Sequence, residues 1–318
     1  MASFGDLNRV NTNVQSLDSQ LSLNRVNREL GDSRMRMSTG LKINKAEDDA
    51  AGYSIATKLR SRVAGLEQSL QNVGDAKSVL DIAETSFDTI MDGLIEMKGL
   101  ATQAANDTLG ATERGYIGDQ IAAIGADINE VANQTVFQDF DLLNGSDNTG
   151  SLSLTFQVGE RASDTITADI DAVNVGELFT SATGTTNLGS TSGGSTDGSA
   201  ITATAATASS QGNLSFATGS NAANSNDFRS FISSIDSAID SMSNRVNDIG
   251  IAQSSLSVRE ETLSESISAN ESAKSRIMDT DFAKEQSNSV KLQILQQTAT
   301  SSLAQANMGP QSVLGFLG

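Results

Sequence analysis

The densest run of residues that could do chemistry is a step of three consecutive carboxylates, Glu47, Asp48 and Asp49. Clustered carboxylates suit hard cations such as Ca2+, but this run lacks the Asp-x-Asn-x-Asp-Gly spacing of a calcium-binding loop between helices. Lys42 and Lys45 precede the run, so the same residues suit a charged connector that makes ion pairs between segments. We expect the connector and no metal site.

The composition removes most catalytic chemistry. The 318 residues include no His and no Cys. His is the commonest general base and metal ligand, so its absence excludes Ser-His-Asp triads and the usual zinc sites. Without Cys the chain has neither disulfides nor thiolate chemistry. An enzyme could still rely on Asp, Glu or Lys, but we expect a protein that is not an enzyme and binds no cofactor.

The chain is strongly acidic, with a formal net charge of −18. Nucleic-acid binding needs clustered Lys and Arg that neutralise phosphates, so we expect no nucleic-acid partner. The acidity suits either an ordinary solvated surface or adaptation to high ionic strength, where salt screens dense like charge. The sequence contains no run of about 18 apolar residues, so we expect no membrane span. The N-terminus also lacks the pattern of a cleaved signal peptide.

Two segments far apart in the sequence share a heptad spacing. Apolar residues recur every three or four positions over residues 59–101 and again over residues 228–256. A repeat of about 3.5 residues predicts a helix that buries a narrow stripe against another helix, so the two segments are natural partners. A third helix, over residues 117–131, runs antiparallel to the first if residues 107–111 form a turn. The side chains that we expect to pack this rod are Leu66, Leu70, Leu80, Phe87, Leu94, Ile121, Ile124, Ile235, Ile239, Val246, Ile249 and Leu256.

In the middle of the chain the period changes from that of helices to that of strands. Polar and apolar residues alternate over residues 151–159 and 164–170, which predicts a β-hairpin at one end of the rod. Residues 176–226 are dominated by Gly, Ser, Thr, Ala and Asn. That composition suits a flexible linker or a small β-rich surface domain, and alternation at residues 200–205 and 214–217 favours the ordered insert. The abundant hydroxyls leave O-glycosylation open.

The predicted fold is mainly α with a small β part. A long antiparallel, coiled-coil-like helical bundle is formed by the N- and C-terminal segments, with a β-hairpin at one end and a small β insert rich in Gly, Ser and Thr. Residues 31–54 are expected to form an ordered connector with short helical pieces. We divide the chain into an N-terminal assembly helix with the start of the connector (1–44), the N-terminal part of the rod with the hairpin (45–175), a surface-exposed insert (176–226), the C-terminal part of the rod (227–275) and a C-terminal assembly helix (276–318).

Both ends of the chain are amphipathic, although the rod already uses the middle seams. Their apolar stripes need another surface, which is either the other end of the same chain or copies from other chains. Isolated helices are marginal until they dock, and a repeated head-to-tail contact between copies gives an open helical polymer. Asp279 or Thr280 can cap the last helix. The residues that we expect to be buried on assembly are Leu7, Val10, Asn11, Val14, Leu17, Leu21, Phe282, Ile294, Leu295, Leu303, Val313 and Leu314.

Ordered motifs at both ends carry a family resemblance. The N-terminal half contains VNTN at residues 10–13, MSTGLKIN at 37–44, DDAAG at 48–52, QTVF at 134–137, LLNG at 142–145 and FQVG at 156–159. The C-terminal half contains AKSRIMDTDFA at residues 273–283, QILQQ at 293–297, LAQAN at 303–307 and PQSVL at 310–314. In this order the motifs resemble bacterial flagellin, the filament subunit of the flagellum, over about residues 1–175 and 227–318.

The resemblance implies a structural function. It implies a self-assembling filament subunit for motility, whose termini form the inner helical core of a tubular filament while a variable insert faces solvent. The location would be extracellular, after flagellar type III export without a cleaved signal peptide. The implied partners are further copies of the chain, hook-filament junction proteins, the filament cap and an export chaperone. Two alternatives stay open: a hook-filament junction protein of the same family and, in a different class, a coiled-coil adhesin or binding module.

One further expectation concerns recognition by animal hosts. Vertebrate flagellin receptors of the Toll-like class recognise an arginine, a leucine and a glutamate on the long helices of responsive members. The matching positions here are Glu96, Leu100 and Gln120, of which only the leucine is kept. The resemblance therefore implies weak or absent receptor activation.

Overall fold

The computed structural model describes residues 12–144, 150–179, 185–187, 201–204, 212–216 and 223–317, with side chains through residue 308 except in residues 185–187 and 204. Its helices are α1 (Val14–Thr39), α2 (Ala50–Ala104), α3 (Ala111–Gln134), α4 (Val175–Phe179), α5 (Ser225–Met278) and α6 (Phe282–Leu317). Its strands form small antiparallel sheets: β1 (Val136–Phe137) with β2 (Phe140–Asp141), β3 (Ser151–Gln157) with β4 (Thr165–Asp171), and β5 (Thr185–Asn187), β6 (Ile201–Thr204) and β7 (Leu214–Phe216) in that order. The prediction of a mainly helical fold with small β parts is confirmed.

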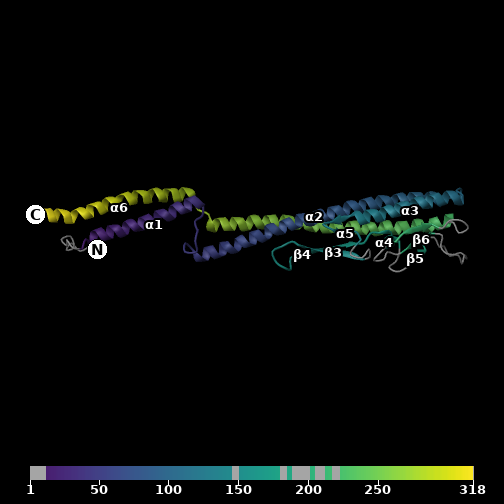
Figure 1. The fold of residues 1–318 in the computed structure, drawn as a ribbon, viewed down its shortest axis with the longest axis horizontal. Coiled ribbons are helices and arrows are strands. Elements are labelled where there is room, and N and C mark those ends of the chain that lie inside the picture. Colours follow the sequence, from purple (N-terminus) through teal and green to yellow (C-terminus); the bar gives the residue numbers. More distant parts are fainter. Residues whose placement is uncertain are drawn as a thin grey trace. The chain divides into compact units, whose positions relative to one another are not determined.

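The chain forms two compact units (Figure 1). One comprises residues 1–64 with 267–318, and the other comprises residues 65–266, so the long helices α2 and α5 contribute to both. The predicted connector over residues 31–54 is wrong in extent, because α1 continues to Thr39 and α2 begins at Ala50. Gly31 costs about 1 kcal/mol in a helix, but burial of its neighbours Leu30 and Ser33 holds the helix through it.

In the larger unit, α2 packs antiparallel against α5. Lys77 Nζ lies 3.0 Å from Glu260 Oε2, and Lys98 Nζ lies 2.6 Å from Asp236 Oδ1. The partner's number on α5 falls as the number on α2 rises, as an antiparallel pair requires. Ion pairs this exposed contribute only about 0–1 kcal/mol each, so their main effect is on register.

Helix α3 turns back along α2, as the sequence predicted. Thr135 Oγ1 donates to Ser86 Oγ at 2.8 Å, and Gly93 faces Ile124 and Ile128. The interior between α2, α3 and α5 is apolar. Its largest fully buried side chains on these helices are Phe87, Phe228, Phe231, Leu80, Ile90, Leu94, Met97 and Ile121.

The predicted β-hairpin is present as β3 and β4. The strands pair in register from Ser151 with Asp171 to Gln157 with Thr165. Side chains alternate between an exposed face and a more buried one, which includes the buried Ala168 and Ile170 of β4, as expected for a sheet with one wet face. The carbonyl of Gln157 accepts a hydrogen bond from Asn72 Nδ2 at 3.1 Å, which holds the hairpin on α2.

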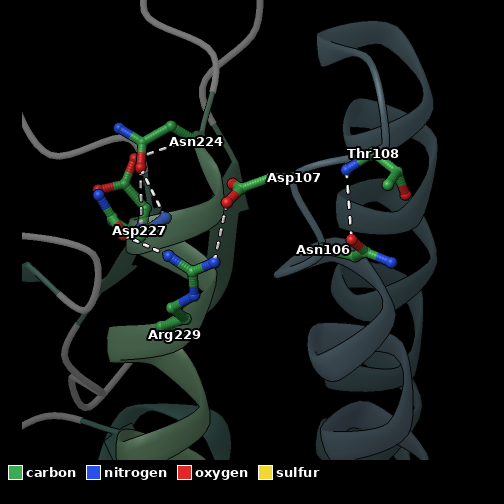
Figure 2. Close-up of polar contacts among 7 residues, drawn as sticks. Asn106, Asp107, Thr108, Asn224, Asp227 and Arg229 are labelled. Atoms are coloured by element: carbon green, nitrogen blue, oxygen red, sulfur yellow. Dashed lines mark hydrogen bonds and ion pairs between the residues drawn. The ribbon is translucent and has the colours of Figure 1, made fainter.

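A polar network ties the turn between α2 and α3 to the first turn of α5 (Figure 2). Arg229 donates to Asp107 Oδ2 at 3.2 Å, while Asn224 and Asp227 form a reciprocal cap in which each carries an acceptor for the other's backbone N–H. A hydrogen bond from Ser225 and the adjacent Arg229 guanidinium lower the pKa of the Asp107 carboxyl. The network therefore fixes where the C-terminal half of the rod begins.

Leu94 and Ile95 offer a matched test of the core of this unit. Leu94 is fully buried, whereas 55% of Ile95 is exposed. Leu94→Ala leaves a cavity, so we expect it to lower the free energy of unfolding by about 2–5 kcal/mol, against about 0.5 kcal/mol for Ile95→Ala. Urea unfolding of the monomer, followed by circular dichroism, measures both losses. Equal losses would contradict this assignment of the core.

Candidate assembly surface

Helices α1 and α6 lie side by side as an antiparallel pair (Figure 1). Asn13 Nδ2 donates to the carbonyl of Ala306 at 2.8 Å, and Gln296 Nε2 donates to Asn27 Oδ1 at 2.7 Å. Asn13 also caps α1, because its Oδ1 accepts the N–H of Ser16 at 3.0 Å. Each end of the chain therefore packs against the other end of the same chain, which is one of the two surfaces that the sequence left open.

This pairing leaves many large apolar side chains exposed. The exposed ones on α1 and α6 range from 39% to 67% exposed and are Val14, Leu17, Leu21, Met35, Phe282, Val290, Ile294, Leu295 and Met308. Among the described side chains of these two helices, the buried apolar ones are Leu30, Leu292 and Ala306, and the buried polar ones are Ser33, Glu285 and Ser289. The pair therefore buries as many polar side chains as apolar ones while it exposes several leucines and isoleucines, which is an unfavourable pattern in water.

Two of the buried polar groups are also poorly satisfied. Ser33 Oγ and Glu285 Oε1 are buried without a hydrogen-bond partner in the part of the chain that is described. A buried polar atom left unpaired costs about 1–3 kcal/mol. The contact between α1 and α6 is therefore weak for its size.

A groove of about 360 Å3 runs between α1 and α6. Small and polar residues make up most of its walls, and Val26 and Leu295 are its larger apolar ones. Helices pack when the side-chain ridges of one enter the grooves of another, so this depression suits a further helix. The lining residues are Gln15, Asp18, Ser19, Ser22, Val26, Leu295, Thr298, Ala299 and Ser302.

The connector between α1 and α2 is bonded to the connector between α5 and α6. Leu41 and Asp279 form an isolated antiparallel bridge. The N–H of Thr280 donates to the carbonyl of Gly40 at 2.9 Å, and the N–H of Lys42 donates to the carbonyl of Met278. Gly40 ends α1 with a φ of 73°, a left-handed conformation that favours glycine. Backbone bonds thus join segments from the two ends of the sequence.

The carboxylate run makes bonds within this connector. Asp48 Oδ2 accepts the N–H groups of Asn44 and Lys45 at 2.9 and 3.0 Å, and these bonds, with Arg36 at 3.8 Å, lower the pKa of the Asp48 carboxyl. Asp49 Oδ1 accepts N–H groups in the first turn of α2. In the described part of the chain, no group of three or more Asp or Glu side chains is arranged to hold a metal ion. The carboxylates act here as turn and cap residues.

The cap of α6 differs from the prediction. Asp281 Oδ1 accepts the N–H groups of Ala283 and Lys284 at 3.0 and 3.2 Å, which makes Asp281 the capping residue. The predicted caps, Asp279 and Thr280, were wrong because the bridge to the other connector takes up both residues.

The predicted assembly residues fall into three groups. Leu7, Val10 and Asn11 lie outside the described residues, and Val313 and Leu314 lie in α6 beyond its described side chains. The exposed group is Val14, Leu17, Leu21, Phe282, Ile294 and Leu295, while Leu303 is half-buried. The contact between α1 and α6 itself rests on Leu30, Leu292 and Ala306, which are not among the predicted assembly residues. For Leu30 the heptad spacing was an available signal.

The remaining predicted residues lie on the long helices. Leu66, Leu80, Phe87, Leu94, Ile121, Ile235, Ile249 and Leu256 are buried, and Leu70, Ile124, Ile239 and Val246 are half-buried. Among the receptor-equivalent positions, Glu96 and Gln120 are exposed and Leu100 is half-buried. Within the described segments, no helix has the length and apolarity needed to cross a membrane.

Asp48 gives the connector a predicted pH dependence. Its pKa is lower in the folded chain than the usual value of about 3.9, so its contribution to stability is present above that value and is lost as the pH falls through the folded pKa. We expect Asp48→Asn to lower the melting temperature at pH 7 and to reduce the difference between the melting temperatures at pH 7 and pH 3. Glu47→Gln, which removes the same charge one residue away, is the control. Identical pH profiles for the two variants would contradict the assigned role of Asp48.

The sequence is similar to known bacterial flagellins. Residues 10–148 match the family model of the bacterial flagellin N-terminal helical region, and residues 232–317 match that of the C-terminal helical region. Flagellin A of Vibrio cholerae is 30% identical over an alignment that covers 97% of this chain and 99% of that protein. The flagellin of Bacillus subtilis is also 30% identical, with the same coverage of both chains.

A solved structure shares the fold. A protein from Vibrio parahaemolyticus, assigned as flagellar hook-associated, matches 73% of this chain and 100% of its own with a TM-score of 0.52 and 14% identity. With full-length relatives at 30% identity and both terminal regions matched, this chain belongs to the bacterial flagellin family and is a structural subunit of the flagellar filament, outside the cell, and not an enzyme.

Proposed function

We propose that the subunit assembles by coupled folding and polymerisation of its terminal helices. The observation that carries this proposal is the unfavourable pattern of α1 and α6, which exposes Leu17, Leu21 and Ile294 while burying Ser33 and Ser289. A single chain gains little from such a pair. Neighbouring copies that cover the outer stripes supply the missing apolar burial, at about 1.5–3 kcal/mol for each large side chain.

The occupant that fits the groove between α1 and α6 is a terminal helix of another copy. The groove walls are mostly small and polar, with Val26 and Leu295 as the larger apolar residues, whereas Leu17, Leu21 and Ile294 are exposed and do not line the groove. Because every copy carries both the exposed apolar side chains and the groove, the apolar side chains of one copy can dock in the groove of the next. Repetition of such a contact between unlike surfaces builds an open helical polymer.

The alternative within the family is a hook-filament junction protein. The likeness to the hook-associated structure is one of fold alone, at 14% identity. The full-length relatives at 30% identity are flagellins, which favours the filament subunit itself. Copy number separates the two, because a filament subunit is present throughout the filament and a junction protein in a single ring. Family membership leaves the coiled-coil adhesin without support.

The other partners rest on the family resemblance. We propose hook-filament junction proteins, the filament cap and an export chaperone as partners, with export that needs no cleaved signal peptide. For vertebrate receptors of the Toll-like class we propose weak or absent recognition, because Glu96 and Gln120 replace the arginine and glutamate of responsive members.

Ile294 and Ile251 provide a matched test of the proposed assembly surface. The two side chains are 58% and 57% exposed, but Ile294 lies on α6 and Ile251 on α5. We expect Ile294→Gln to raise the critical concentration for polymerisation roughly tenfold or more, which corresponds to about 1.4 kcal/mol per subunit. Ile251→Gln should have a clearly smaller effect. Sedimentation of filaments measures both, and an Ile294→Gln variant that polymerises like the parent would contradict the proposal.

The acidic charge predicts a salt dependence of assembly. Subunits of charge −18 repel when packed, and the screening length is roughly 30 Å at ~10 mM salt but only a few Å at ~500 mM. The critical concentration should therefore fall as salt rises over this range. Equal polymerisation at both ends of the range would show that repulsion between subunits does not limit assembly, and would remove the support for adaptation to high ionic strength.

A further inference from the structure

We propose that β7, the returning strand of the insert, is a structural staple of the rod that joins α3 to α5. The sequence suggests a surface-exposed insert over residues 176–226, but Leu214 on β7 and Ile201 and Ala203 on β6 are buried. Two features of the rod receive this strand: a glycine notch on α3 and an aromatic cluster on α5.

The notch on α3 is made by two buried glycines. A Cβ on Gly118 would lie 2.9 Å from Cγ of Phe216, and a Cβ on Gly125 would lie 3.3 Å from Cδ1 of Leu214. Gly115, one turn earlier on the same helix, has nothing within 4 Å of the corresponding position. A glycine inside a helix costs about 0.5–1 kcal/mol relative to alanine. At Gly118 and Gly125 the close approach of β7 explains why that cost is tolerated.

The aromatic cluster reaches from β7 to α5. The ring of Phe216 stacks on Phe228 with centroids 5.9 Å apart and meets Phe231 edge-on at 5.8 Å. Phe179 of α4 lies 5.7 Å from Phe231. Phe228 and Phe231 are fully buried. Because Phe216 also touches Gly118, this single ring contacts the N-terminal and the C-terminal halves of the rod.

The side-chain amide of Asn129 on α3 binds both the segment that enters the insert and the segment that returns from it. Asn129 Oδ1 accepts the N–H of Val175 at 2.9 Å, where the chain enters the insert, and its Nδ2 donates to the carbonyl of Gly212 at 3.0 Å, where the chain returns to β7. Only a side chain with both a donor and an acceptor makes this pair of bonds. Val175 is fully buried. The ends of the insert are thus part of the rod, and undocking β7 would uncover Phe228 and Phe231.

Two glycine substitutions on α3 separate docking from helix propensity. Propensity alone predicts that Gly118→Ala and Gly115→Ala both stabilise the helix. Docking predicts that Gly118→Ala lowers the melting temperature of the full-length monomer by roughly 2 °C or more, whereas Gly115→Ala leaves it unchanged or raises it. Equal stabilisation by the two changes would overturn the proposal.

Phe216 completes a double-mutant cycle with Gly118. Phe216→Ala should lower the melting temperature by roughly 6 °C or more and speed amide exchange in the first turns of α5, whereas Phe140→Ala, at a ring that is 67% exposed, should do neither. In the double variant the loss from Gly118→Ala should largely vanish, because the ring that it meets is gone. Additive effects, or a Phe216→Ala variant that melts and exchanges like the parent, would overturn the staple. All measurements use the monomer, so the result does not depend on the proposed polymerisation mechanism.

Discussion

The smaller unit is governed by apolar surface that α1 and α6 do not bury between themselves. Two helices packed side by side each hide one stripe, and here those stripes contain Ser33, Glu285 and Ser289 beside Leu30 and Leu292. Other large apolar side chains, among them Leu17, Leu21 and Ile294, are exposed. Helices that gain little from tertiary packing are marginal in water, so the pair of α1 and α6 is suited to a setting in which further helices surround it. The chain belongs to the bacterial flagellin family, and in the proposed assembly neighbouring copies would provide such a setting.

The larger unit buries most of its large apolar side chains within one chain, although Ile95, Phe140 and Ile251 remain exposed. The seams of α2, α3 and α5 close on one another, and Phe87, Leu94 and Ile235 are fully buried within a single chain. Its polar contacts lie mostly at helix surfaces and ends, where they set register and boundaries more than they add stability. The proposed staple formed by β7 belongs to this larger unit. The larger unit therefore has an extended apolar core within one chain, whereas the smaller unit buries few apolar side chains and leaves many exposed.

The sequence revealed the features that periodicity records. The heptad spacing predicted the long helices and the alternation predicted β3 and β4, because each pattern reflects a local repeat. It failed where a distant segment decides: α1 passes through Gly31 because its neighbours are buried beside α6, and Asp279 is taken from capping by its bridge to Leu41. The docking of β7 was equally out of reach, since Gly118 is only a weak helix former until Phe216 is known to lie on it.

The most direct test of coupled folding and polymerisation is amide hydrogen exchange, measured on the full-length monomer and on filaments. The account predicts that amides of α1 and of α6 through residue 308 exchange at least roughly tenfold faster in the monomer, while those of the buried α2 seam between residues 66 and 97 exchange alike in both states. Equal protection of α1 and α6 in monomer and filament would contradict it.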